Sequence, residues 1–391
     1  MLSGRVPRDL GPTAWARTLE ERRARGAPLL DLTEANPTRV GLGGAGESEL
    51  AALASAGAAR YEPDPRGSES ARAAVAACYG GRGLAVDPGD IVLTAGTSEA
   101  YAHLFRLLAD PGGSFLVPAP SYPLFDPLAA LESIALRRYR LAFHGRWSLD
   151  PGSLEHAFDA GARGVIVVQP NHPTGSCLAP SEIEEVEARC EAHAAAIVSD
   201  EVFGDFPWPP AEAPLPSLLG ARRVPTFVLG GLSKLCGMPG MKLSWIVVAG
   251  PRAARAEALA GLEWIADLFL SVSTPVQTAL PRLLGARRAF QVALRARLAA
   301  NLATVRAFVA RRPEFDLLPA EGGWVAVLRA PRVRSEEEWV LELMRRDVVV
   351  HPGHFYEFES EAHLVLSLIV EPKHLAEGLA RLEALAADDR A

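Results

Sequence analysis

Residues 226–247 read TFVLGGLSKLCGMPGMKLSWIV, and this stretch decides the fold. A run of β-branched and apolar residues, TFVLGG, is followed three residues later by Lys234. A loop rich in glycine and proline then carries Lys242 and leads into a second apolar run, SWIVVAG at 244–250. Apolar runs of this length predict strands that are buried on both faces. Lys234 is therefore expected just past the end of a buried strand.

Similar runs occur upstream and are separated by helical patterns. They are IVLT at 91–94, SFLVP at 114–118, GVIVVQP at 164–170 and AIVSD at 196–200. The segment SEIEEVEARCEAHAA at 181–195, between the last two runs, is typical of a helix. Strands that alternate with helices predict an α/β fold, with a mainly parallel central sheet covered by helices.

The chain has 391 residues, which is too many for one hydrophobic core, so we expect two domains. The alternating pattern assigns residues 45–275 to a large α/β domain. Residues 1–44 and 276–391 are assigned to a smaller α+β domain. The smaller domain is predicted to contain a helix at 13–25 with Thr13 as its N-cap, a long helix at 276–312, and strands within 322–330, 347–353 and 363–370.

Composition excludes several classes of function. The net charge of -7 argues against a nucleic-acid partner, because the phosphate backbone requires a basic surface. The first residues lack the apolar core of a signal peptide, and no apolar stretch is long enough to span a bilayer. Four cysteines are scattered without the spacing of a metal site, as is typical of a reducing cytoplasm. We expect a cytoplasmic protein without a membrane partner or a metal.

Ligands of open α/β sheets bind at the carboxyl ends of the strands. The strand at 91–94 runs into a turn that contains Gly96, Thr97 and Ser98, and a helix begins at once. Free backbone N–H groups and a hydroxyl at a helix N-terminus favour a phosphate. This turn is therefore a candidate phosphate site.

Two other strand ends carry polar side chains. The strand at 164–170 leads into Asn171 and His172, in a loop that two prolines and a glycine hold in place. The strand at 196–200 ends on Asp200. A carboxylate at the buried edge of a sheet requires a cation or hydrogen-bond donors as partners. Lys234 is the candidate cation.

The motifs at these strand ends resemble those of the class I and II aminotransferases, which have the type I fold of pyridoxal-phosphate enzymes. They are Ser233-Lys234 followed by Gly-x-Pro-Gly-x-Lys, the loop Pro-Asn-His-Pro-Thr-Gly, and Asp-Glu-Val-Phe. Their order and approximate spacing match the family over essentially the whole chain. The resemblance implies pyridoxal 5'-phosphate as cofactor. It also implies transfer of an amino group from an amino acid to a 2-oxo acid.

Roles follow from the resemblance position by position. Lys234 matches the lysine that binds the cofactor as a Schiff base and then moves a proton during the reaction. Asp200 matches the carboxylate that keeps the ring nitrogen protonated. Gly96, Thr97 and Ser98 match the residues that bind the phosphate.

Two tyrosines and a serine complete the implied cofactor site. Tyr122, in PAPSYPLFD, matches the aromatic residue that stacks on the cofactor ring. Tyr61, in RYEPDPRG, resembles the tyrosine that reaches the phosphate of the neighbouring subunit, which implies a homodimer with shared active sites. Ser233 belongs to the same motif as the lysine that follows it.

The sequence departs from the family at several cofactor positions. His172 stands where an asparagine usually hydrogen-bonds the phenolic oxygen, and Asn171 is the alternative if the loop is shifted. Phe203 stands where a tyrosine often donates to the same oxygen. Gly231 replaces a phosphate-binding serine, and Lys242 replaces an arginine, so the phosphate contacts are expected to be weaker.

The largest departure concerns the substrate. The family's C-terminal strand carries an arginine that binds the substrate α-carboxylate, but the matching position here is Val365. Asn36 and Arg39, in the same N-terminal loop, are the candidate substrate-binding residues, with Arg39 as the candidate replacement for the arginine. His351 and His354 lie in a loop that could also approach the substrate, and their spacing makes a poor metal site. The missing arginine leaves a second kind of reaction open, that of a pyridoxal-phosphate lyase, decarboxylase or cyclase.

Overall fold

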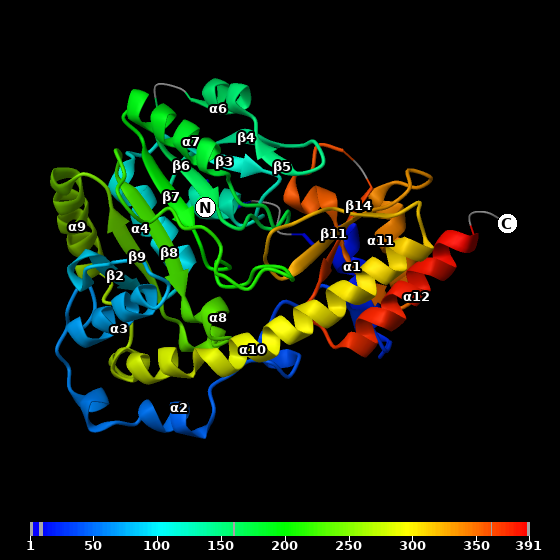
Figure 1. Ribbon diagram of the computed structural model, residues 1–391, viewed down its shortest axis with the longest axis horizontal. Coiled ribbons are helices and arrows are strands. Elements are labelled where there is room, and N and C mark those ends of the chain that lie inside the picture. Colours follow the sequence, from blue (N-terminus) through cyan, green and yellow to red (C-terminus); the bar gives the residue numbers. More distant parts are fainter. Residues whose placement is uncertain (1–2, 8–10, 159–160, 361, 389–391) are drawn as a thin grey trace.

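The computed structural model describes residues 3–7, 11–158, 161–360 and 362–388. An eight-stranded sheet has the strand order β2-β9-β8-β7-β6-β3-β4-β5 (Figure 1). Its strands are β2 (Ile91–Thr94), β3 (Ser114–Ala119), β4 (Ala135–Phe143), β5 (Trp147–Leu149), β6 (Ala162–Val168), β7 (Ala196–Asp200), β8 (Thr226–Gly231) and β9 (Ser244–Ala249). The six apolar runs of the sequence are β2, β3, β6, β7, β8 and β9, so those strand predictions are confirmed.

The sheet is mainly parallel. Neighbouring strands run parallel from β8 through β7, β6 and β3 to β4. Strand β9 is antiparallel to both β8 and β2, because the chain between β8 and β9 has only one helical turn and a loop, too little for a crossover helix. Strand β4 has no counterpart among the predicted strands, because arginines at 137, 138 and 140 interrupt its apolar pattern.

Helices cover both faces of this sheet. The helices of this part of the chain are α2 (Glu47–Ala52), α3 (Glu69–Gly80), α4 (Thr97–Leu108), α5 (Phe125–Leu131), α6 (Pro151–Ala157), α7 (Pro180–Ala192), α8 (Leu232–Leu235) and α9 (Arg252–Asp267), of which α2 packs on α10 rather than on the sheet. Successive strand residues face opposite sides, so Leu93 and Val228 pack with α3, α6 and α7, whereas Val92 and Phe227 pack with α4, α5 and α9.

The remaining elements form a second group, which helix α10 (Thr274–Arg311) joins to the first (Figure 1). They are α1 (Ala14–Ala24), β1 (Leu30–Asp31), β10 (Asp316–Leu317), β11 (Val325–Arg329), α11 (Glu336–Arg345), β12 (Val348–Val349), β13 (His351–Pro352), β14 (His363–Ser367) and α12 (Pro372–Asp388). Strands β10, β11, β14 and β13 form an antiparallel sheet. The predicted helices at 13–25 and 276–312 are confirmed as α1 and α10.

The N-terminal segment belongs to this second group. Thr13 caps α1, since its Oγ1 accepts a hydrogen bond of 3.2 Å from the backbone N–H of Ala16. Strand β1 pairs in parallel with β12. The hydroxyl of Ser367, at the end of β14, donates to the backbone oxygen of Glu34 at 2.7 Å. We therefore propose the division that the sequence suggests, with residues 45–275 as the large domain and residues 1–44 and 276–391 as the small one.

The hydropathy of the helices bears on membrane insertion. Within the described residues, no helix combines the length and the apolar character that crossing a bilayer requires.

Phe227 tests the packing at the centre of the large sheet. Its side chain is fully buried between β8 and the helices of one face. We expect Phe227→Ala to lower the free energy of unfolding by about 3–5 kcal/mol, because it removes apolar contacts and leaves a cavity. Val292→Ala is the control, since Val292 is 64% exposed. Urea denaturation measures both, and equal effects of the two substitutions would contradict the packing described here.

Candidate active site

The strand ends that the sequence singles out lie together on the side of the large sheet where its parallel strands have their carboxyl ends. Strands β6, β7 and β8 are parallel neighbours, so the residues that follow them lie together. Helix α8 begins directly after β8 and carries Ser233 and Lys234 in a single turn. Asp200 is the last residue of β7. The loop with Asn171 and His172 follows β6.

The amine of Lys234 lies beside two aromatic rings. Its Nζ is 5.5 Å from the ring centre of Phe203 and 5.2 Å from that of Trp324. Burial lowers the pKa of Lys234, and the nearby charge of Asp200 opposes that shift only in part. The amine is therefore closer to its neutral, nucleophilic form than an exposed lysine would be.

Asp200 is held by donors from two sides. The hydroxyl of Tyr101, on α4, donates to Oδ2 at 3.0 Å, and the backbone N–H of Val202 donates to Oδ1 at 3.2 Å. Burial raises the pKa of Asp200, whereas both hydrogen bonds and the charge of Lys234 lower it. A cationic group placed against this carboxylate would stabilise its ionised form.

The loop after β6 contains Asn171 and His172, the two candidates for a hydrogen bond to a ligand, and their side chains make different contacts. Asn171 uses both amide hydrogens within the loop region, donating to the backbone oxygen of Pro120 at 3.0 Å and to Oγ1 of Thr174 at 2.9 Å. It has no donor left for a ligand. The ring of His172 instead lies 5.8 Å from that of Tyr122 and is stacked at 5.9 Å on that of Phe203.

His172 is uncharged at neutral pH. Burial, and then the nearby charge of Lys234, lowers its pKa to about 3. A neutral imidazole carries one N–H donor and one acceptor nitrogen. Of the two candidates, His172 is thus the residue that can donate a hydrogen bond to a ligand beside Lys234.

The candidate phosphate turn is the N-terminus of α4, which follows strand β2. Gly96 is the N-cap of α4, and Thr97 and Ser98 are the first residues of that helix. Lys242 reaches this turn, since a β-carbon added at Gly96 would lie 3.4 Å from its Nζ. A helix N-terminus with a lysine beside it is suited to bind an anion.

The sequence does not predict a part for Ser244, the first residue of β9. Ser244 is opposite both Thr94 and Gly231 in the sheet, and a β-carbon at 231 would collide with its hydroxyl. Its hydroxyl thus lies beside position 231, close to the place that the β-carbon of a serine there would take. The pairing of β9 with β8 and β2 is what places Ser244 beside Gly231. The sequence alone could not reveal this, because the pairing depends on the antiparallel direction of β9.

Other predicted site residues lie elsewhere. The side chain of Asn36 caps a 3₁₀ turn at Pro37–Arg39 by accepting from the backbone N–H of Thr38 at 3.1 Å. Arg39 is ion-paired with Glu34 at 3.3 Å, and its side chain is 74% exposed. Residues 36–44 nevertheless approach the lysine loop, because Gly44 N–H donates to the backbone oxygen of Gly237 at 2.9 Å.

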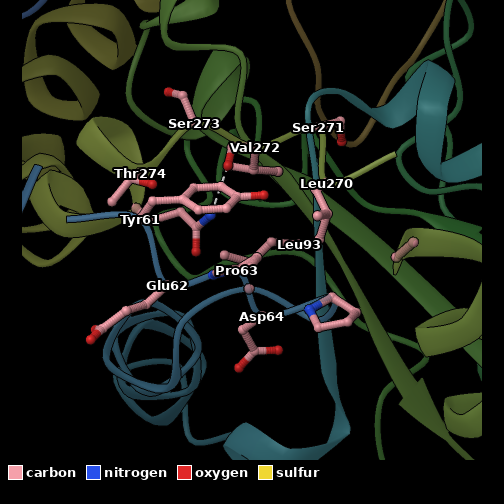
Figure 2. A pocket seen from close by; sticks show the side chains of 14 residues that line it. Tyr61, Glu62, Pro63, Asp64, Leu93, Leu270, Ser271, Val272, Ser273 and Thr274 are labelled. Atoms are coloured by element: carbon pink, nitrogen blue, oxygen red, sulfur yellow. Dashed lines mark hydrogen bonds between the residues drawn. The ribbon is translucent and has the colours of Figure 1, made fainter. Parts of the chain in front are cut away.

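Tyr61 is not grouped with Lys234 in the described part of the chain. It is 76% exposed and lines a separate pocket of about 150 Å³, together with residues 270–274 (Figure 2). That Tyr61 serves a neighbouring subunit therefore stays a prediction.

Comparison with known proteins identifies the family. The model of the family described as aminotransferase class I and II matches residues 26–382. A glutamate-pyruvate aminotransferase of Escherichia coli is 30% identical over 276 residues, which cover 69% of this chain and 66% of the relative, slightly under two thirds of its length. A tyrosine aminotransferase of Mus musculus is 30% identical over 217 residues, covering 55% of this chain and 47% of the relative.

The chain belongs to the class I and II aminotransferase family.

A solved structure of an alanine aminotransferase from Pyrococcus furiosus has the same fold, with a TM-score of 0.86 over 96% of both chains at 21% identity. The predicted type I fold, with its mainly parallel sheet, is thereby confirmed. Members of this family depend on pyridoxal phosphate. Because the similar proteins bear the names of aminotransferases, a lyase, decarboxylase or cyclase is not favoured.

The residues at the strand ends fit this cofactor. Lys234 offers a buried amine, and Asp200 offers a carboxylate that is already oriented by two donors. Lys242 reaches the N-terminus of α4, where a phosphate can be held. The rings of His172 and Tyr122 lie 5.8 Å apart, and His172 is close enough to Lys234 for the charge of that amine to lower its pKa.

Ser244 provides a test of the phosphate site. We expect Ser244→Ala to weaken pyridoxal phosphate binding about tenfold, because a hydrogen bond to a charged group is worth about 1.5–3 kcal/mol. Binding of pyridoxal, which lacks the phosphate, should not change. Absorbance titration of the cofactor-free protein measures both affinities.

The double variant Gly231→Ser with Ser244→Gly is the matched control. It moves the hydroxyl to the neighbouring strand and removes the collision, so it should restore the affinity for pyridoxal phosphate. An equal loss of affinity for pyridoxal and for its phosphate would contradict the assignment.

Proposed function

We propose that this protein transfers an amino group from an amino acid to a 2-oxo acid, with pyridoxal phosphate bound covalently to Lys234. The observation that carries the proposal is the buried Lys234 amine, set beside Asp200 at the carboxyl edge of the sheet. The names of the similar proteins support this reaction class. They do not fix which amino acid reacts here.

The cofactor, when bound, supplies an aromatic ring that accepts electrons from the substrate carbon. We propose that Asp200 keeps a proton on the ring nitrogen, because its carboxylate accepts that N–H best when ionised. Lys234 Nζ would accept the proton that the substrate carbon releases and would later give that proton up again. A lysine with a lowered pKa suits both steps, since it accepts a proton readily and also releases it.

We assign the other cofactor contacts as part of the same proposal. His172 donates to the phenolic oxygen, because Asn171 has no amide hydrogen left. Tyr122 and Phe203 pack on the cofactor ring, and Ser233 belongs to the turn that presents the lysine. The phosphate is bound by Gly96, Thr97 and Ser98 of α4, with Lys242, Ser244 and the Tyr61 of a second copy.

A second copy of the chain is supported by an apolar surface beside Tyr61. Trp264 is 70% exposed, Leu268 is 66% exposed and Phe269 is 51% exposed, at the end of α9 and just after it. The pocket that contains Tyr61 is lined by the neighbouring Ala266 and Leu270. Large exposed apolar patches mark interfaces between proteins. We propose a homodimer in which Tyr61 reaches the partner's site.

We expect Leu268→Asp to convert the dimer to a monomer, because it buries an unpaired charge in the proposed interface. The dimer-to-monomer change is measured by size-exclusion chromatography with light scattering. The cofactor affinity of the resulting monomer should fall as well, since Tyr61 no longer reaches a partner's phosphate. Leu131→Asp is the control, since Leu131 is 50% exposed on α5, outside this patch. Unchanged mass for Leu268→Asp would contradict the proposed surface.

Lys234 can be tested with little ambiguity, because the chain has only two other lysines, Lys242 and Lys373. We expect Lys234→Ala to abolish turnover and the absorbance of covalently bound cofactor. Borohydride reduction followed by peptide mapping should locate the cofactor on Lys234 alone. Lys373→Ala is the control, as its side chain is 74% exposed. Covalent cofactor retained in Lys234→Ala would refute the assignment.

Two wider predictions remain proposals. We place the protein in the cytoplasm, a view supported by four cysteines that are all free and buried thiols. We also propose a biosynthetic role, with small-molecule amino acids and 2-oxo acids as the partners.

A further inference from the structure

The small domain contributes one wall of the site. A 3₁₀ turn at Gly353–Tyr356 carries Tyr356, whose ring lies 5.4 Å from that of His172 in an edge-on arrangement. The turn is docked on the large domain, because Ser121 N–H donates to the backbone oxygen of Tyr356 at 2.9 Å. Tyr356 therefore lies at the cofactor site, on the side of the small domain.

Tyr356 is paired with a histidine. Its hydroxyl is 2.9 Å from Nδ1 of His351, in strand β13. If the hydroxyl donates to Nδ1, then Nε2 of His351 carries the free hydrogen. If Nδ1 carries the hydrogen and donates, then the tyrosine O–H is free. In either tautomer the pair keeps one unused donor.

His351 occupies the position next to Val365. The two residues are directly opposite each other in the antiparallel pair β13–β14. Side chains of such a pair point to the same face of a sheet and lie close together. The only polar side chain of this cross-strand pair is thus that of His351, because valine offers no donor to an anion.

The groups that surround His351 keep it uncharged. Trp15 of α1 lies 5.4 Å from its ring and Phe355 lies 5.7 Å away, while Asp31 of β1 is the nearby acid. Burial lowers the pKa of His351 to about 4, although the charge of Asp31 opposes the shift. Arg39, the other candidate for an anion, is turned toward Glu34.

We propose that His351 and Tyr356 form the group that recognises the carboxylate of the amino acid and of the 2-oxo acid. The pair supplies an uncharged hydrogen-bond donor beside Val365, the position where the arginine of the family would make an ionic contact with the carboxylate. This inference rests on the proposed transfer of amino groups. A neutral donor discriminates for the carboxylate less strongly than a guanidinium, so the site also admits amines that lack it.

The test compares matched donors. Bleaching of the bound cofactor's absorbance is followed with L-tyrosine and tyramine, and with L-alanine and ethylamine. Each amine has the side chain of its amino acid and lacks only the carboxylate. We expect Tyr356→Phe and His351→Phe to lower kcat/KM for the amino acids by about 10- to 100-fold, mainly through KM, and to leave the amines unchanged.

A binding measurement gives a second readout. The affinity for 3-phenylpropanoate, an unreactive carboxylate, is measured from the shift it causes in the cofactor spectrum. It should fall by a similar factor in both variants. Tyr139→Phe is the control, because its hydroxyl is also buried but donates to the backbone oxygen of Ile166 within the large domain.

Two results would overturn the proposal. One is an equal loss for amino acids and amines in Tyr356→Phe and His351→Phe. The other is a carboxylate-selective loss in Arg39→Gln in place of these two variants. Failure of the proposed function has a different signature, since the unaltered protein would then respond to no amino acid in the panel.

Discussion

The site depends on a buried amine and a buried carboxylate at the edge of one sheet. Lys234 and Asp200 are each costly to bury alone, because a charge loses its hydration in the protein interior. Each relieves part of that cost for the other, and Tyr101 and Val202 supply the hydrogen bonds that the carboxylate still needs. The strand order β8-β7-β6 and its parallel direction bring these groups together.

The small domain completes the site by direct contacts. Gly44 donates to the backbone oxygen of Gly237 in the loop after the lysine, and within the proposed small domain Ser367 donates to the backbone oxygen of Glu34, which holds the N-terminal segment against β14. Tyr356 is attached to Ser121, which lies next to the aromatic residue Tyr122. The substrate side is therefore built from segments that are far apart in the sequence. The positions of these segments depend on contacts between the two proposed domains. Lys234 and Asp200, in contrast, are positioned by neighbouring strands of one sheet.

The sequence predicts what depends on local pattern. Buried strands show themselves as continuous apolar runs, and their ends locate Lys234, Asp200 and the turn at Gly96 to the residue. The helix at α10 and the cap at Thr13 are likewise local signals. Strand β4 is missed because it is only partly buried and its exposed positions tolerate arginines, so its pattern is not that of a buried strand.

What the sequence by itself determined is the family, the cofactor and the cofactor-binding strand ends, because these follow from motifs whose residues are adjacent along the chain. Only the tertiary structure shows that both amide hydrogens of Asn171 are already used, which is the basis for proposing His172 as the donor. It alone placed Ser244 opposite Gly231 and His351 opposite Val365. Cross-strand partners depend on the direction and register of pairing, and neither property is contained in a single strand.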